Sequence, residues 1–262
     1  MGREGRVPDH TTIARAFVSL DPEWLDRTVS LTADMCLDEA DKASEIGCGR
    51  LAADSTGVET DRYGVQERPS KNEEDFKPVR VKTYLKWHIL AAVGLQVILS
   101  CRMTPSNVAD TTVFTDLLDG TGRMRRRLGG WSVLADRGYD SDSNDKAVFD
   151  LGMHPNIKQK ANAKNRGKPY RRRAAGEFDS DLYKRRGMVE AIFGAAETAD
   201  HRLYSRYRRP ETQARFGPTL ATCMNEETPN RIRCAGELGP SAYRGLSGKG
   251  GRNHGFVGGS PP

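Results

Sequence analysis

Leu51-Ala-Ala-Asp54-Ser55-Thr56-Gly57 is a short apolar run that ends in polar residues. A second run, Trp131-Ser-Val-Leu-Ala-Asp136, is built in the same way. Apolar runs of this length, bounded by turn-forming residues, are typical of buried β-strands. Because adjacent strands of one sheet end at a common edge, the two runs predict a pair of carboxylates, Asp54 and Asp136, lying side by side where strands give way to loops.

The other patterned segments are a mixture of strands and helices. Residues 84–93 and 95–103 are rich in β-forming residues and are separated by Gly94, which predicts an antiparallel pair. Residues 59–77 are polar and are expected to form a loop. A further strand is predicted over 154–158, and helices over 8–17, 108–118, 142–151 and from about Asp181 onward.

A strong helix start lies near the N-terminus. Asp21-Pro22-Glu23 supplies an acid at the cap, a proline at the first helical position and an acid in the first turn. The apolar residues that then fall on one face at helical spacing are Leu20, Trp24, Leu31 and Met35. We expect a helical N-terminal segment over residues 1–47, ahead of a main domain.

The pattern fails beyond about Pro218. Residues 235–262 are rich in Gly, Ser, Pro and Arg and hold hardly any apolar side chains. Such a segment buries too little apolar surface to offset the entropy of ordering it. We therefore expect the main domain over residues 48–217 and a disordered tail over 218–262.

Length, charge and cysteine content narrow the class of protein. The 262 residues allow one full-sized domain plus an appendage, and the net charge of +6 favours a polyanionic partner, most commonly nucleic acid. The five cysteines are odd in number and widely spaced, so neither a zinc site nor a disulfide framework is indicated. The longest apolar stretch, 89–99, is too short to span a bilayer, so we expect a cytoplasmic chain without a membrane partner.

A third acid, Glu190, lies on the helix predicted from about Asp181. Three clustered carboxylates repel one another and need cations, and Mg²⁺ or Mn²⁺ are the natural partners of oxygen ligands. Taken singly, each acid has a simpler explanation. An Asp at a strand end is commonly a turn or helix cap, and a lone helical Glu is commonly solvated.

Tyr183, Arg186 and Glu190 are spaced by three and four residues, so they share one face of that helix. The residues on the neighbouring face, which can pack inward, are Val189, Ile192, Phe193 and Ala196. This spacing predicts that an aromatic ring, a cation and an acid lie close together on one face of the helix. The alternative is an ordinary surface pair between Arg186 and Glu190, worth a few tenths of a kcal/mol.

Three blocks resemble the acidic blocks of insertion-sequence DDE transposases. They are residues 51–57, residues 134–141 and residues 183–194. The third is similar to the group with a Tyr-Arg-Glu-Lys signature: Tyr183, Arg186 and Glu190 match it, and Glu197 stands where that group has Lys. The resemblance covers roughly residues 8–217.

The resemblance implies an α/β fold of the ribonuclease-H-like type, a mixed five-stranded sheet flanked by helices, with a short helical N-terminal remnant. Asp54 would lie on the first strand, Asp136 on the fourth and Glu190 on a following helix, where they would be the catalytic residues and the ligands of two Mg²⁺ or Mn²⁺ ions. Residues 11–17 resemble the second helix of a helix-turn-helix, whose first helix would lie before Met1.

The reaction implied is metal-dependent cleavage at transposon ends, followed by attack of the freed 3′-hydroxyl on target DNA. DNA, comprising terminal repeats and target, would be the partner of a homodimer associated with the nucleoid. The eight cations between Lys158 and Arg173, with no acid among them, support DNA contact, although a solvated loop would look the same. The residues predicted to contact DNA are Tyr183, Arg186, Arg137, Tyr139, Lys158, Lys160, Arg171, Arg172 and Arg173.

Two alternatives to an active transposase stay open. One is a decayed, non-catalytic DNA-binding remnant, which Glu197 and the atypical ends of the chain favour. The other is a ribonuclease-H-like nuclease that cleaves without strand transfer. The histidines show no ligand spacing, and His88, inside an apolar strand, is expected to be structural.

Overall fold

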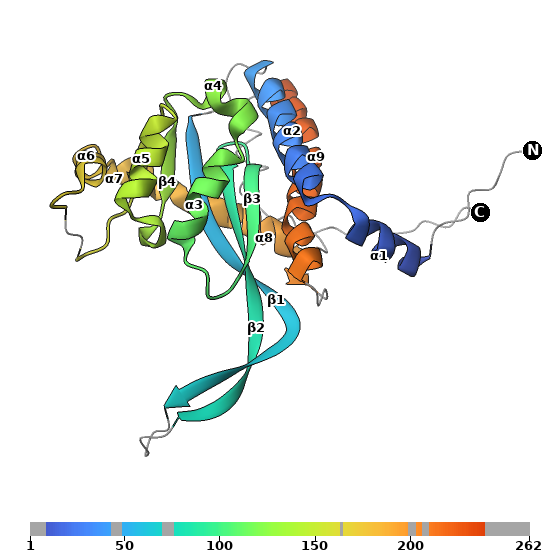
Figure 1. Ribbon diagram of the computed structural model, residues 1–262. Helices are drawn as coiled ribbons and strands as arrows, with labels where there is room; N and C mark the ends of the chain where they lie inside the picture. Colours follow the sequence, from blue (N-terminus) through green and yellow to red (C-terminus); the bar gives the residue numbers. More distant parts are fainter. Residues whose placement is uncertain are drawn as a thin grey trace, which may run out of the picture.

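A mixed β-sheet forms the centre of the protein, whose computed structural model describes residues 9–42, 49–69, 76–162, 165–198, 203–205 and 210–238. The strands are β1 (Arg50–Pro69), β2 (Phe76–Ala92), β3 (Val97–Pro105), β4 (Ser132–Ala135), β5 (His154–Ile157) and the short β6 (Tyr204–Ser205). Their order is β3-β2-β1-β4-β5, with β6 beside β1. The strands β1 to β4 are labelled in Figure 1. The pairs β1–β2 and β2–β3 are antiparallel, whereas β4 and β5 run parallel to β1. This arrangement confirms the predicted ribonuclease-H-like sheet and adds β6 to it.

Residues 51–53 of β1 and 133–135 of β4 are buried because both faces of the sheet are covered. Alternate residues of a strand point to opposite faces. Leu51 and Ala53 belong to a core that includes α3 (Asp110–Asp119) and α5 (Asp142–Asp150), on what we call the α3 face. Ala52 and Leu134 belong to a second core with α8 (Met188–Thr198), on the α8 face.

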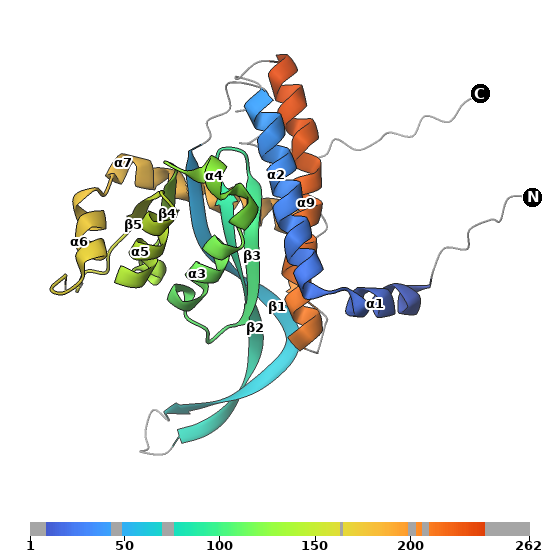
Figure 2. The same cartoon turned by 45° about the horizontal axis from the view of Figure 1, so that its top comes forward.

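Two helices near the N-terminus differ in how they join this body. α1 (His10–Ser19) is capped by Asp9, which accepts a hydrogen bond from Thr12 N at 2.8 Å, and it buries none of its residues. It projects away from the sheet (Figure 2). α2 (Pro22–Lys42) begins where predicted, with Asp21 accepting from Glu23 N at 3.0 Å.

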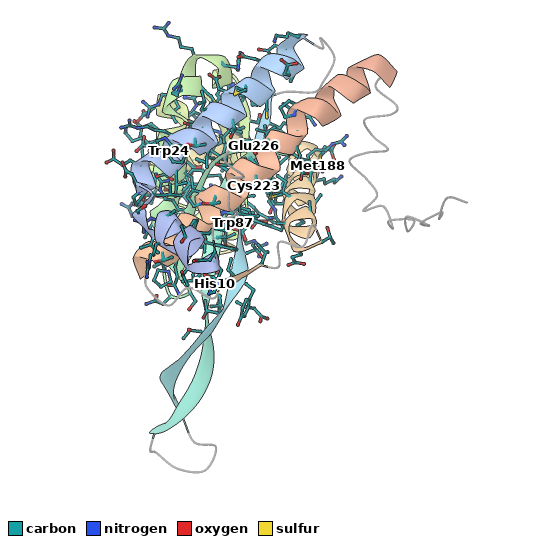
Figure 3. All side chains as sticks on the ribbon, turned by 90° about the vertical axis from the view of Figure 1, so that its right-hand side faces the viewer. His10, Trp24, Trp87, Met188, Cys223 and Glu226 are labelled. Atoms are coloured by element: carbon teal, nitrogen blue, oxygen red, sulfur yellow. The ribbon has the colours of Figure 1, made fainter. Side chains whose placement is uncertain are left out.

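The face of α2 picked out by its apolar spacing is directed outward. Trp24, Leu31 and Met35 are 54%, 44% and 55% exposed, and Trp24 lies on the outer side of the helix in Figure 3. The face that packs on the sheet holds Leu25, Val29, Ala33, Cys36, Leu37 and Ala40. Most of these side chains belong to the two cores of the sheet, so α2 is part of the main body and not of a separate N-terminal segment.

α9 (Pro210–Leu238) corrects the predicted tail. It runs beside α2 and packs on β3 (Figure 3), with Leu220, Ala221, Asn225 and Thr228 buried. Residues 218–238 are therefore helical, and the main domain does not end at residue 217. The remainder of the predicted tail, residues 239–262, lies outside the described residues.

A long two-stranded arm corrects the predicted loop over 59–77. β1 continues to Pro69 and β2 begins at Phe76, with the register shifting between Glu59 and Tyr63. The arm extends well beyond the body of the protein (Figures 1 and 2), and residues 70–75 at its tip lie outside the described residues. In the described part of the chain, no helix combines the length and apolar character that crossing a membrane requires.

Candidate active site

The sheet brings Asp54 close to Asp136, but only Asp136 follows the end of a strand, because β1 continues past Asp54 to Pro69. β1 and β4 pair in parallel with Ala53 opposite Ala135, so the residue after each alanine emerges at the same edge. Asp54 Oδ1 accepts a hydrogen bond from Ser55 N at 2.9 Å. Asp136 Oδ1 accepts from Gly138 N at 2.7 Å and so caps the turn Arg137–Tyr139. Both carboxylates are thus oriented by backbone N–H groups next to them.

Arg186 joins this pair to Glu190. Its Nη1 lies 2.7 Å from Asp54 Oδ2, and its Nη2 lies 3.7 Å from Glu190 Oε1. The predicted continuous helix is interrupted here: Tyr183 ends α7 (Ser180–Tyr183), Arg186 lies in a 3₁₀ turn (Lys184–Gly187), and Glu190 lies in the first turn of α8. The tighter 3₁₀ turn changes the spacing of Tyr183, Arg186 and Glu190. Arg186 still lies between Asp54 and Glu190.

Burial dominates the electrostatics of Asp54. It raises the pKa of the carboxyl group, and the nearby Asp136 raises that pKa further, while Ser55 N–H and Arg186 lower it. The Asp54 side chain is 17% exposed, whereas that of Glu190 is 68% exposed. The neighbouring carboxylates of Asp54 and Asp136 therefore need a positive charge beside them. Arg186 supplies one through its contact with Asp54.

The donor set suits a hard divalent cation. Asp54, Asp136 and Glu190 offer only carboxylate oxygens, which Mg²⁺ and Mn²⁺ prefer. Among the described residues, however, no three acids, histidines or cysteines are gathered closely enough to hold an ion. Glu190 is largely exposed and in contact with Arg186, so the site presents two neighbouring carboxylates and a third that is linked to them through Arg186.

Several predicted DNA contacts gather near this edge. The ring of Tyr183 lies 5.6 Å from that of Phe178, and Lys158 Nζ is 5.3 Å from the Tyr183 ring centroid. Arg137 is exposed on the turn after Asp136. Aromatic and cationic groups so close to the carboxylates would suit the sugar-phosphate backbone of a nucleic acid.

Other predicted contacts have structural roles instead. Tyr139 is 1% exposed, with its ring 5.5 Å from that of Phe114, so the prediction that it contacts DNA is wrong. Arg171 forms an ion pair with Asp140, its Nε lying 2.8 Å from Oδ1, and this pair fixes the helix α6 (Pro169–Gly176) to the body. Burial explains both outcomes, since a side chain held inside the protein cannot reach a phosphate.

The remaining cations of the basic segment differ in their surroundings. Arg173 pairs with Glu177 at 2.9 Å and lies 4.0 Å from the Phe149 ring centroid. Lys160 and Arg172 are exposed on the surface. These two stay predicted DNA contacts, whereas Arg173 is partly engaged within the protein.

Sequence reasoning missed a carboxylate close to the pair. Asp110, at the start of α3, contacts Ser55, Lys86 and His88. His88 is fully buried and pairs with Thr104 Oγ1 at 2.8 Å, which confirms its structural role. The available signal was the alternation Lys86-Trp87-His88-Ile89, which places polar side chains on one face of an otherwise apolar strand.

The part of the chain that carries this site also matches a known protein family. The sequence model of the family described as transposase DDE domain matches residues 49–225. No curated protein matches the chain.

Solved structures of the Mos1 mariner transposase are similar at low identity. Its paired-end complex with Mn aligns at 11% identity and a TM-score of 0.36, covering 91% of this chain and 66% of that one. Its strand transfer complex aligns at 12% identity and a TM-score of 0.36, covering 96% and 67%. Its paired-end complex with Mg aligns at 10% identity and a TM-score of 0.30, covering 79% and 68%. This chain thus spans about two thirds of the length of the chains that it matches.

Proposed function

We propose that this chain, which belongs to the transposase DDE domain family, is a metal-dependent DNA transposase that cuts transposon ends and joins them to target DNA. The observation that supports the proposal is the parallel pairing of β1 with β4 directly before Asp54 and Asp136, with Arg186 in contact with both Asp54 and Glu190. The match to the family spans well over half of the chain and includes all four residues.

Each residue of the site has a proposed task. Asp54 and Asp136 would hold divalent ions through their carboxylate oxygens, and Glu190 would complete the set from α8. Two such ions, when bound, activate a water or a 3′-hydroxyl and stabilise the leaving oxygen of a phosphodiester. Arg186, 21% exposed, offers its guanidinium to a phosphate beside the carboxylates.

DNA would approach along the side that carries the exposed cations. Lys158 and Tyr183 lie together next to Arg186, while Lys160 and Arg172 extend the positive surface over the loop and α6. A homodimer on DNA would place one such site at each transposon end. We also propose that the protein acts in the cytoplasm, on the DNA of the nucleoid.

The test is an assay with DNA that ends in the inverted repeats flanking the gene. A transposase should cut this DNA and join it to a target in a reaction that depends on Mg²⁺ or Mn²⁺. Cutting without joining would identify a nuclease, and binding without cutting would identify a decayed copy. Either result would overturn the proposed function.

Glu197 offers a test of the DNA-facing side of α8. It is exposed and lies seven residues beyond Glu190, about two helical turns, so the two side chains point the same way. We expect Glu197→Lys to strengthen binding to end DNA about tenfold at low salt, because the substitution replaces a repulsion from phosphate by an attraction. Titrations of both proteins at one salt concentration measure the change.

Glu226→Lys on α9 is the matched control, because Glu226 is also exposed and the charge change is the same. An equal gain from both substitutions would indicate a general effect of net charge. Weaker or unchanged binding by Glu197→Lys would show that residue 197 does not face DNA.

A further inference from the structure

Asp110 ties helix α3 to both strands next to the carboxylate pair. Its Oδ1 accepts hydrogen bonds from Lys86 Nζ at 3.0 Å and from Ser55 Oγ at 3.4 Å. Lys86 lies on β2, and Ser55 lies on β1 immediately after Asp54. One carboxylate at the start of a helix therefore contacts β1 at the residue next to Asp54.

The other oxygen of Asp110 abuts the turn that carries Asp136. A Cβ placed on Gly138 would lie 3.0 Å from Asp110 Oδ2 and 2.9 Å from Asp136 Oδ1. Only glycine lets these two carboxylates approach the turn from both sides. Tyr139, the next residue, packs its ring against Phe114 of α3, so the same helix fixes the turn a second time.

Asp110 lies near Asp54 and Asp136, and without a nearby cation the negative charges of these acids would repel one another. Lys86 provides it: its ammonium group contacts Asp110 and also donates to Val108 O at 3.0 Å, and its side chain is only 21% exposed. His88 Nδ1 lies 3.6 Å from Asp110 Oδ1, but burial lowers the pKa of His88 to about 4, so the ring is neutral at pH 7. Lys86 is thus the cation that offsets Asp110.

The two faces of the sheet separate Asp110 from the reacting groups. Asp54 follows Ala53 and shares the side of Ala52, which packs on the α8 face, and its partner Arg186 precedes α8. Ser55 shares the side of Ala53, on the α3 face, where it meets Asp110. Asp110 therefore contacts the residue next to Asp54 and the turn after Asp136, and it contacts Asp54 only through this neighbour.

We propose that Asp110 is a positioning residue that fixes Asp54 and Asp136 relative to each other through Ser55 and the turn at Gly138. The role rests on the proposed function, in which that pair holds divalent ions. Loss of an outer residue that orients metal ligands typically lowers metal affinity or activity about 10- to 100-fold. A displacement of about 1 Å at a reacting centre has an effect of similar size.

Asp110→Asn tests the role, with Asp116→Asn as control because Asp116 is exposed on the same helix. The first measurement is thermal unfolding during titration with Mn²⁺ alone. We expect Asp110→Asn to need about tenfold or more Mn²⁺ for half-maximal stabilisation. The second is steady-state cleavage of end DNA, where kcat should fall about 10- to 100-fold while KM for DNA stays within about twofold. Asp116→Asn should match the wild type in both.

Gly138→Ala provides a second variant if Asp110→Asn does not fold. It keeps the Asp110–Lys86 pair but displaces both carboxylates, so the Mn²⁺ requirement should rise in the same way. Wild-type Mn²⁺ dependence in either folded variant would overturn the positioning role. A wild-type protein that binds Mn²⁺ without cutting DNA would contradict the proposed function alone, and one that Mn²⁺ does not stabilise would overturn the positioning role too.

Discussion

Asp54→Asn is expected to reduce metal-dependent cleavage of transposon-end DNA about a hundredfold or more. The substitution removes a negative charge and one of the two carboxylates of the pair, while the amide keeps the size of the side chain. Loss of roughly 3 kcal/mol of transition-state stabilisation corresponds to that factor. Single-turnover cleavage over a range of Mg²⁺ and Mn²⁺ concentrations measures it.

DNA binding by Asp54→Asn should persist, since one fewer acid would then face the phosphates. Asp181→Asn is the control: this acid has an 84% exposed side chain and pairs only with Lys184 among the described contacts, outside the site. It should cleave at the wild-type rate. Unchanged cleavage by Asp54→Asn would remove Asp54 from the active site and, with it, the proposed identity of the carboxylate pair.

The carboxylate pair could be predicted from sequence because the information is local. Each acid follows directly on a short buried apolar run, and the pairing of β1 with β4 then brings the two acids close together, although β1 itself continues to Pro69. Arg186 and Glu190 could be predicted from helical spacing, although the 3₁₀ turn between them could not. That turn depends on how α7 and α8 pack on the sheet, which no local pattern records.

The sequence-based predictions were wrong where segments far away in the sequence determine whether a side chain is buried. Tyr139 follows Asp-Arg-Gly on a turn that looked exposed, but α3 brings Phe114 over it. α2 carries apolar residues at helical spacing on two faces, and spacing alone selected the outward face, which holds the bulky Trp24, Leu31 and Met35. Asp110 escaped notice because an acid at a helix start is common, and only the folded chain shows Lys86 and Gly138 beside it.

α9 was missed in part because one of its buried contacts with the sheet is made by a polar side chain. Asn225 is fully buried, and its side-chain amide forms hydrogen bonds with the backbone of β3, as a neighbouring strand would. Its Oδ1 accepts from Ile98 N at 2.9 Å, and its Nδ2 donates to Ile98 O at 2.8 Å. Ile98 lies next to the register shift between β2 and β3, so its backbone groups depend on this side chain. An amide among Thr, Glu and Pro residues gives no apolar periodicity to detect.

Asn225→Ala is therefore expected to destabilise the whole protein. It would leave a buried N–H and a buried C=O of Ile98 without partners, each costing about 1–3 kcal/mol, or roughly 2–5 kcal/mol together. For a domain of this size that corresponds to a fall in Tm of about 5–15 °C. Urea and thermal unfolding measure the loss, and an unchanged dependence on urea would show that the unfolding transition stays the same.

Glu226→Ala, at the next position of α9, separates the buried contact from the helix itself, because Glu226 is exposed. It should leave the unfolding midpoint where it is, since alanine favours helix and no buried group loses a partner. Asn225 Nδ2 also lies 3.3 Å from Thr32 Oγ1 on α2, so the Asn225→Ala variant weakens both contacts of α9 at once. Wild-type stability in that variant would mean that α9 does not pack on β3, and the main domain would then end near residue 217 after all.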